Sequence, residues 1–114
     1  MKALLIPAAG PGTVIDLPSG GARLTNALRT LIGTGCAERL QVTSRWEAWL
    51  DEDGAAAGKP VNQAATLVAR SFGFEVSFLG AVVITGVDKN TAEPAALSPA
   101  QARAILERIR EPPA

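Results

Sequence analysis

Residues 79–86 read Leu-Gly-Ala-Val-Val-Ile-Thr-Gly, and this stretch decides the fold. It is a short apolar run that contains and ends on glycine, which is typical of a strand buried on both faces. The run predicts a strand over residues 79–85 in the centre of a sheet.

Two strand candidates lie at the start of the chain. Residues 2–7 form an apolar run that ends at a proline, and residues 13–17 alternate weakly between apolar and polar types. The Gly-Pro-Gly link between them predicts a turn, so the two strands should form an antiparallel hairpin.

Residues 36–42 and 45–51 predict two further strands. Trp46 and Trp49 both fall in the second of these. Because side chains alternate along a strand, a separation of three places the two indoles on opposite faces. We expect one of them in the core and the other partly exposed. The segment 51–54, Asp-Glu-Asp-Gly, predicts a solvated turn rather than a calcium loop, since alanines follow it and no downstream glutamate completes the ligand set.

Three helices complete the fold. Residues 22–32 carry apolar residues at helical spacing: Leu24, Ala27, Leu28, Leu31 and Ile32. A second helix should span 63–72, with Asn62 as its cap and Leu67, Val68 and Phe72 as its buried stripe. The third begins at Ser98-Pro99-Ala100-Gln101, the pattern of a capping box, and Pro112-Pro113 should end it. The sequence predicts an α+β fold, in which a small, mostly antiparallel sheet of about five strands packs with about three helices.

The composition fits one domain over residues 1–114, with a loose C-terminal end at 110–114. Apolar residues make up 47% of the chain, enough for a real core. Eleven basic residues balance eleven acidic ones, so a general affinity for nucleic acid or membranes is not favoured. A single cysteine and the lack of a long apolar segment favour a cytoplasmic protein.

The residue types for ordinary catalysis are missing. The chain has no histidine and no tyrosine, so Cys36 has no imidazole base, and no transition-metal site or cofactor is expected. Cys36 should be a small buried apolar residue. An enzyme would have to use carboxylates, Lys or Ser/Thr. Glu47 with Asp51 is a conceivable carboxylate pair, although solvated strand charges are the simpler interpretation. The sequence therefore favours a protein that is not an enzyme.

Five residues are candidates for a ligand or partner site: Trp46, Trp49, Asn62, Thr66 and Arg70. One exposed tryptophan would be a natural contact for a protein partner. The three polar residues follow the cap and one side of the second helix, where a helix cap and a solvated face are the alternative interpretation.

Several phrases together resemble a known family: the opening Met-Lys-Ala-Leu-Leu-Ile, Ile-Asp-Leu-Pro at 15–18, Trp-Leu-Asp-Glu-Asp-Gly at 49–54, Gly-Lys-Pro-Val-Asn at 58–62, the stretch 79–86 and Leu-Ser-Pro-Ala-Gln at 97–101. They are similar to a family of small domains of unknown function that is found in actinobacteria, their phages, plasmids and conjugative elements. The resemblance implies an accessory protein of mobile elements. Many members have a basic residue after the Asn of Pro-x-Asn, whereas this chain has Gln63.

Two functions follow as hypotheses. The first is a non-catalytic, regulatory module that binds a host or self protein partner; a homodimer is compatible with it. The alternative is a domain that binds a small anionic ligand or nucleic acid through Asn62, Arg70 and the arginines of the last helix, Arg103, Arg108 and Arg110. The interleaved Glu107 and Glu111 favour ion pairs within that helix instead.

Overall fold

The computed structural model describes residues 1–110, and of Arg110 only the backbone. Its six strands form one sheet in which every pairing is antiparallel. The strands are β1 (Lys2–Ile6), β2 (Thr13–Asp16), β3 (Ala37–Gln41), β4 (Trp46–Asp51), β5 (Val82–Val87) and β6 (Pro94–Ala95). Their order is β2-β1-β5-β4-β3, with β6 paired to the end of β5. The chain has the expected α+β fold, including the predicted β1–β2 hairpin.

β5 is the central strand, as its apolar run predicts, and it lies between β1 and β4. Its residues from Val82 to Gly86 are buried. The strand begins three residues later than expected because Leu79 bridges to Val61, and Gly80 turns the chain with a φ of 78°. It continues to Val87, which pairs with Pro94 of the two-residue β6.

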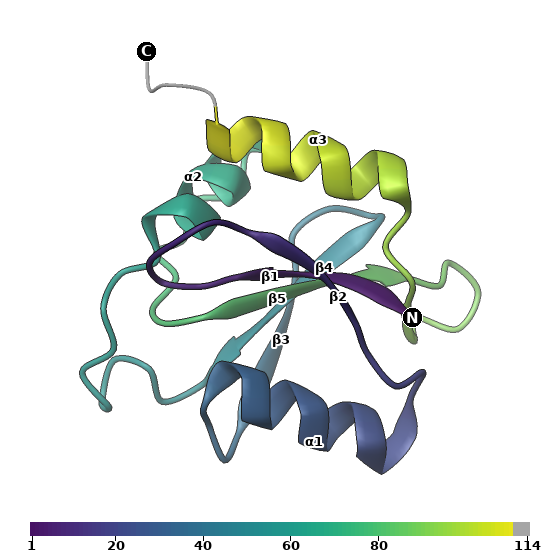
Figure 1. Ribbon diagram of the computed structural model, residues 1–114, viewed down its shortest axis with the longest axis horizontal. Coiled ribbons are helices and arrows are strands. Elements are labelled where there is room, and N and C mark those ends of the chain that lie inside the picture. The colour runs from purple at the N-terminus through teal and green to yellow at the C-terminus, as the bar shows by residue number, and fades with distance from the viewer. Residues whose placement is uncertain (111–114) are drawn as a thin grey trace.

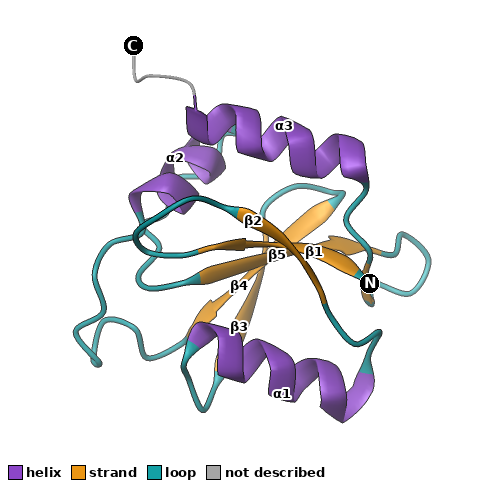
Figure 2. Ribbon diagram, in the orientation of Figure 1, coloured by secondary structure: helices purple, strands orange, loops and turns teal. Residues whose placement is uncertain are grey.

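The helices cover the two faces of the sheet unequally. α1 (Gly21–Ile32) lies on one face, while α2 (Gln63–Ser71) and α3 (Pro99–Arg110) pack together on the other. In Figure 1 and Figure 2, α2 and α3 lie above the sheet and α1 below it. The sheet thus separates two apolar cores.

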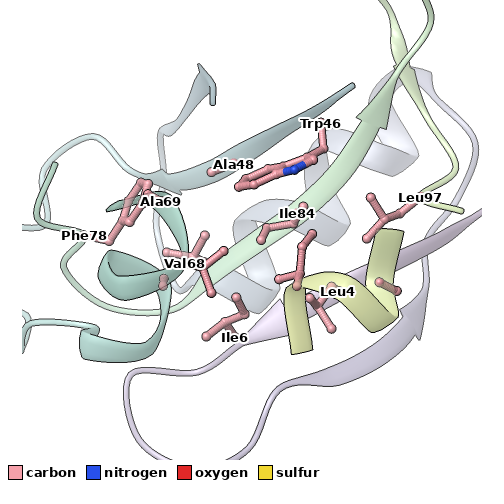
Figure 3. Close-up of a cluster of buried hydrophobic side chains, with 13 residues drawn as sticks. Leu4, Ile6, Trp46, Ala48, Val68, Ala69, Phe78, Ile84 and Leu97 are labelled. Atoms are coloured by element: carbon pink, nitrogen blue, oxygen red, sulfur yellow. The ribbon is translucent and has the colours of Figure 1, made fainter. Parts of the chain in front are cut away.

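The larger core lies under α2 and α3 and is drawn in Figure 3. It joins Leu4 and Ile6 of β1, Ile84 of β5, Val68 of α2 and Trp46 of β4. The smaller core lies under α1 and includes Leu24, Leu28, Ile32 and Val83, with Trp49 packed against it. The prediction that the two indoles occupy opposite faces is therefore confirmed, with Trp46 in the core and Trp49 half-buried.

The helix boundaries follow local signals. Gly33 ends α1 in the left-handed conformation, with a φ of 74°, and its N–H donates to the carbonyl of Arg29. The predicted capping box of α3 is formed: Ser98 Oγ accepts from the Gln101 N–H at 3.1 Å, and the Ser98 N–H donates to Gln101 Oε1 at 3.4 Å. The expected stop at Pro112-Pro113 lies outside the described residues, as does nearly all of the predicted loose end at 110–114.

Two residues of the predicted helical stripes are exposed instead. Leu67 keeps 40% of its surface and Leu31 36%. The buried face of α2 is made by Ala65, Thr66, Val68 and Ala69, and Leu67 lies off this face. Val68 is the one large apolar side chain on this buried face, so the helix is held by fewer large side chains than its apolar content indicates.

Candidate functional site

The five predicted site residues come from β4 and from α2 with its cap, and they do not share one surface. Trp46 is buried and packs edge-on against Phe72, with ring centroids 5.4 Å apart. Thr66 is buried, and its Oγ1 accepts a hydrogen bond from the N–H of Phe78 at 3.0 Å. Arg70 is exposed on α2, on the opposite side of the sheet from Trp49.

Asn62 is fully buried and links three segments of the fold. Its Oδ1 accepts from the N–H of Ala65, which caps α2. Its Nδ2 donates to the carbonyls of Ile6 and Gly80, both at 2.9 Å. An asparagine amide can make about four hydrogen bonds, and Asn62 makes three of them. Asn62 therefore holds the start of α2 against β1 and against Gly80, which precedes β5.

Two of the five line surface hollows: the buried Trp46 borders one of about 270 Å³ beside Phe72, and the half-buried Trp49 borders a larger one. The structure has there a cavity of about 420 Å³, called here the Trp49 hollow. Its lining comes from the start of α1, from β3 and β4, and from the segment that enters β6; the residues are Ser19, Gly20, Gly21, Leu24, Thr25, Leu28, Arg39, Trp49, Glu93 and Pro94.

Arg39 and Trp49 face each other across the β3–β4 pair, where their Cα atoms are direct partners. The guanidinium carbon of Arg39 lies 5.5 Å from the Trp49 ring centroid, within the range of a cation–π contact. The indole N–H of Trp49 donates to Thr85 Oγ1 at 3.0 Å. The ring is therefore fixed in orientation, with its polar edge satisfied inside the fold.

Two hydrogen bonds also fix the guanidinium of Arg39. Its Nε donates to Glu47 Oε2, and its Nη2 donates to the carbonyl of Ala92 in the β5–β6 connection. Glu47 is only 2% exposed, and its Oε1 has no hydrogen-bond partner in the described part of the chain. The negative charge of Glu47 therefore offsets the positive charge of Arg39, which lines the hollow.

The start of α1 leaves backbone N–H groups available at the rim. Gly20 is the cap residue, and among residues 1–110 no side chain accepts from the first turn. Gly21 has a φ of 65°, and a Cβ at either glycine would meet open space. The first N–H groups of a helix need acceptors from elsewhere, so this rim suits a carbonyl or carboxylate of a bound molecule.

The carboxylates expected to be solvated are buried, so that expectation is wrong. Glu47 pairs with Arg39, and Asp51 pairs with Lys59, whose Nζ lies 2.7 Å from Asp51 Oδ2. Hydrogen bonds from Lys59, from the Thr34 hydroxyl and from the Asp53 N–H lower the pKa of Asp51 to about 2. Glu47 and Asp51 are four residues apart on one strand, roughly 13 Å at about 3.3 Å per residue, too far for two carboxyl groups to share one reaction.

Cys36 is exposed, so the expectation that it is buried is wrong as well. Its thiol donates to Glu52 Oε2 at 2.7 Å, and this hydrogen bond, together with the negative charge of Glu52, raises the pKa of the thiol. A raised pKa keeps the sulfur protonated at neutral pH, which is the opposite of what a nucleophilic cysteine requires.

Within residues 1–110, no group of three His, Cys, Asp or Glu side chains is arranged to hold a metal ion. In the same part of the chain, no helix has both the length and the apolar character to cross a bilayer.

Sequence reasoning found Trp49 but missed the residues around it. The predicted hairpin does not identify Arg39, because pairing residues 36–42 with 45–51 end to end sets Arg39 opposite Ala48, one residue away from the observed partner Trp49. No sequence signal brings Gly20 or Glu93 to the same place, since both arrive through tertiary packing of separate segments.

The fold and its surface define a small α+β domain with a rigid Trp–Arg pair in an open hollow. The chain belongs to the family described as Domain of unknown function (DUF3846), whose model matches residues 1–110. No curated protein and no solved structure matches the chain.

Proposed function

We propose that this chain is a non-catalytic protein-binding module, and that the Trp49 hollow is its contact surface. The observation that carries the proposal is the Arg39–Trp49 pair, held rigid by Glu47, Ala92 and Thr85 at the edge of a 420 Å³ hollow. Tryptophan and arginine are the residues most enriched at the energetic centres of protein interfaces, and a fixed side chain loses little entropy on binding.

The charges around the hollow favour a protein over an anionic ligand. Arg39 is offset by the buried Glu47, and Glu93 adds a second negative charge to the lining. A protein segment with an apolar side chain against Trp49 and a backbone carbonyl at the start of α1 meets these surroundings without needing a net positive field.

The alternative is a binder of a small anion or nucleic acid, which the uncapped start of α1 favours. Of the residues predicted to form its binding surface, Asn62, Arg103 and Arg108 do not come together. Asn62 is inside the fold, and Arg108 stacks on Phe72 at 4.0 Å while donating to the carbonyl of Ser71. Arg103 lines a different groove.

The resemblance to domains of actinobacteria, phages, plasmids and conjugative elements supports a regulatory, accessory role for this module. On this proposal the partner is a host protein met in the cytoplasm. The absence of histidine and tyrosine from the sequence is consistent with a role in binding.

Peptides selected from a random display library against the wild-type chain test the proposal. Thr25→Arg fills the hollow and should weaken the selected peptides at least about tenfold, as loss of an interface centre does. Thr30→Arg is the matched control: both threonines are exposed on α1 and bond back to the carbonyl four residues earlier, but only Thr25 lines the hollow.

Equal binding by the two arginine variants, or a selection that enriches nothing, would contradict the proposal. Thermal-shift measurements with inorganic phosphate and with oligonucleotides examine the alternative, because a ligand of the native state must raise the unfolding temperature. A shift lost in Thr25→Arg but not in Thr30→Arg would favour the anion binder instead.

A further inference from the structure

The outer edge of β2 carries no neighbouring strand in the described part of the chain. Val14, in the middle of this strand, keeps 51% of its surface. Beside it lies a groove of about 570 Å³ between β2 and α3, called here the β2 groove. The lining is Lys2, Ala3, Val14, Leu97, Pro99, Ala102, Arg103, Leu106 and Glu107.

The hydrogen-bond pattern fixes which backbone groups of β2 face outward. Met1 and Leu17 exchange both backbone hydrogen bonds, at 2.8 and 2.5 Å, so they form a hydrogen-bonded pair. Such pairs alternate along an antiparallel ladder. With the register Leu4↔Val14 and Lys2↔Asp16, the N–H and C=O groups of Val14 and Asp16 point away from β1, toward the free edge.

The other edge of the sheet is protected in the usual way. β3 presents Glu38, Arg39 and Gln41, all exposed, and charged side chains on an edge strand discourage pairing. β2 has one charged side chain, Asp16 at its end, which pairs with Lys2 of β1 at 2.7 Å. Val14 at its centre and Gly12 just before it carry no charge, so β2 is the less protected of the two edges.

We propose that a second copy of this chain pairs with β2 along this edge, antiparallel and about a twofold axis at Val14. In this arrangement Val14 of each copy donates to, and accepts from, Val14 of the other, and Asp16 lies opposite Gly12. The two sheets become one continuous sheet, and each exposed Val14 side chain is covered by its equivalent.

The side chains of α3 make this surface complementary to itself. Leu106 and Ile109 lie 3.0 and 3.6 Å from where a Cβ on Gly12 would be, so α3 follows β2 closely at that end. Arg103 and Glu107, one turn apart, both line the β2 groove beside Val14. A twofold axis at Val14 reverses α3 and sets Arg103 of one copy toward Glu107 of the other.

The dimer surface and the Trp49 hollow are separate. The β2 groove lies on the face of α3, whereas the hollow lies on the face of α1. The dimer therefore leaves both hollows open and would present two protein-binding sites at once, which raises avidity for a repeated partner.

Sedimentation velocity over a dilution series tests the dimer in the wild-type chain. We expect a species of twice the monomer mass that dissociates in one step on dilution. Amide hydrogen exchange at high concentration should show protection of Val14 and Asp16, whose N–H groups have no acceptor among residues 1–110 of one copy. A monomer at every concentration, or a dimer in which both amides exchange freely, would overturn the proposal.

Val14→Pro removes the N–H that the dimer needs and that makes no hydrogen bond within residues 1–110 of one copy, and proline is tolerated at such edge positions. It should be monomeric, while the matched control Val14→Thr, which keeps the N–H, should remain dimeric. A dimeric Val14→Pro chain would count against β2 as the interface.

Charge reversal gives a second test should the proline variant fail to fold. Arg103→Glu places like charges across the axis and should weaken association at least about tenfold. The double variant Arg103→Glu/Glu107→Arg restores opposite charges and should recover the dimer. No recovery, or no effect of the single reversal, would contradict the twofold arrangement.

Discussion

At the scale of single residues, the buried hydrogen bonds of Asn62 give this residue a structural role. Asn62→Ala removes the α2 cap and leaves the carbonyls of Ile6 and Gly80 without their donor inside the fold. We expect a loss of roughly 2–4 kcal/mol in the free energy of unfolding, measured by urea denaturation. Arg70→Ala, on the exposed face of the same helix, should change it by no more than about 0.5 kcal/mol. Equal, small effects would show that the amide contributes little.

Gly86 is required by a close approach of the backbone. A Cβ at this position would lie 2.5 Å from the carbonyl oxygen of Ala96, in the segment between β6 and α3. Gly86→Ala should therefore cost about 1–3 kcal/mol, since neither the central strand nor this segment can move freely.

Gly35 is the matched control, because a Cβ there meets nothing within 4 Å. Gly35→Ala should be neutral, or stabilise by up to about 1 kcal/mol through the unfolded chain. Thermal unfolding of the two variants measures the difference. If both alanines have the same effect, the approach of Ala96 to β5 is not as close as described.

At the scale of elements, Lys59 joins the end of β4 to the end of α1. Its Nζ contacts Asp51 Oδ2 and donates to the carbonyls of Ile32 and Gly33, both at 3.0 Å. A cation at the C-terminus of a helix meets the negative end of the helix dipole. Lys59 thereby fastens the long loop 52–62 both to a strand of the sheet and to the helix that covers one face of it.

This contact predicts a pH dependence of stability. The folded state lowers the pKa of Asp51 from 3.8 to about 2, so the ionised carboxylate stabilises the fold above pH 3.8, and that contribution is lost as the pH falls toward 2. Asp51→Asn lacks the stabilisation by the carboxylate. Between pH 3.8 and pH 2, the urea concentration that half-unfolds this variant should therefore fall less than that of the wild type.

Asp53→Asn is the control for this measurement. Asp53 is exposed in the same turn, and its substitution should leave the pH profile parallel to that of the wild type. A profile of Asp51→Asn that is parallel to the wild type as well would mean that the ion pair does not stabilise the fold.

The elements themselves were largely predictable from the sequence. Apolar periodicity and the breakers Gly33 and Ser98-Pro99 placed α1 and α3 closely, and the run 79–86 gave the central strand. The two-residue β6 was missed because Pro94–Ala95 carries no apolar pattern, and it forms only where the chain crosses back over Gly86.

The candidate site was predictable only in part. Alternation along one strand correctly separated Trp46 from Trp49, because it depends on local geometry alone. The burial of Glu47 and Asp51 could not be foreseen, since each is buried by a cation from another segment, Arg39 and Lys59. Contacts between distant segments leave no periodic signal in a single sequence.

At the scale of the whole molecule, the sheet divides two surfaces with different chemistry. The α1 face carries the rigid Arg39–Trp49 pair, and the opposite face carries the β2 groove beside α3. The formal net charge is zero, so long-range repulsion between copies is weak and a partner is not attracted by charge alone. Recognition would therefore depend on shape and on a few fixed side chains.

Site-specific photocrosslinking in the native host tests the central claim, that the Trp49 hollow contacts a protein, most directly. A benzophenone amino acid is placed at Thr25, on the rim of the hollow, or at Thr30, farther along α1. We expect a discrete adduct from position 25 that is absent from position 30. No adduct from position 25, or the same adducts from both positions, would contradict the claim.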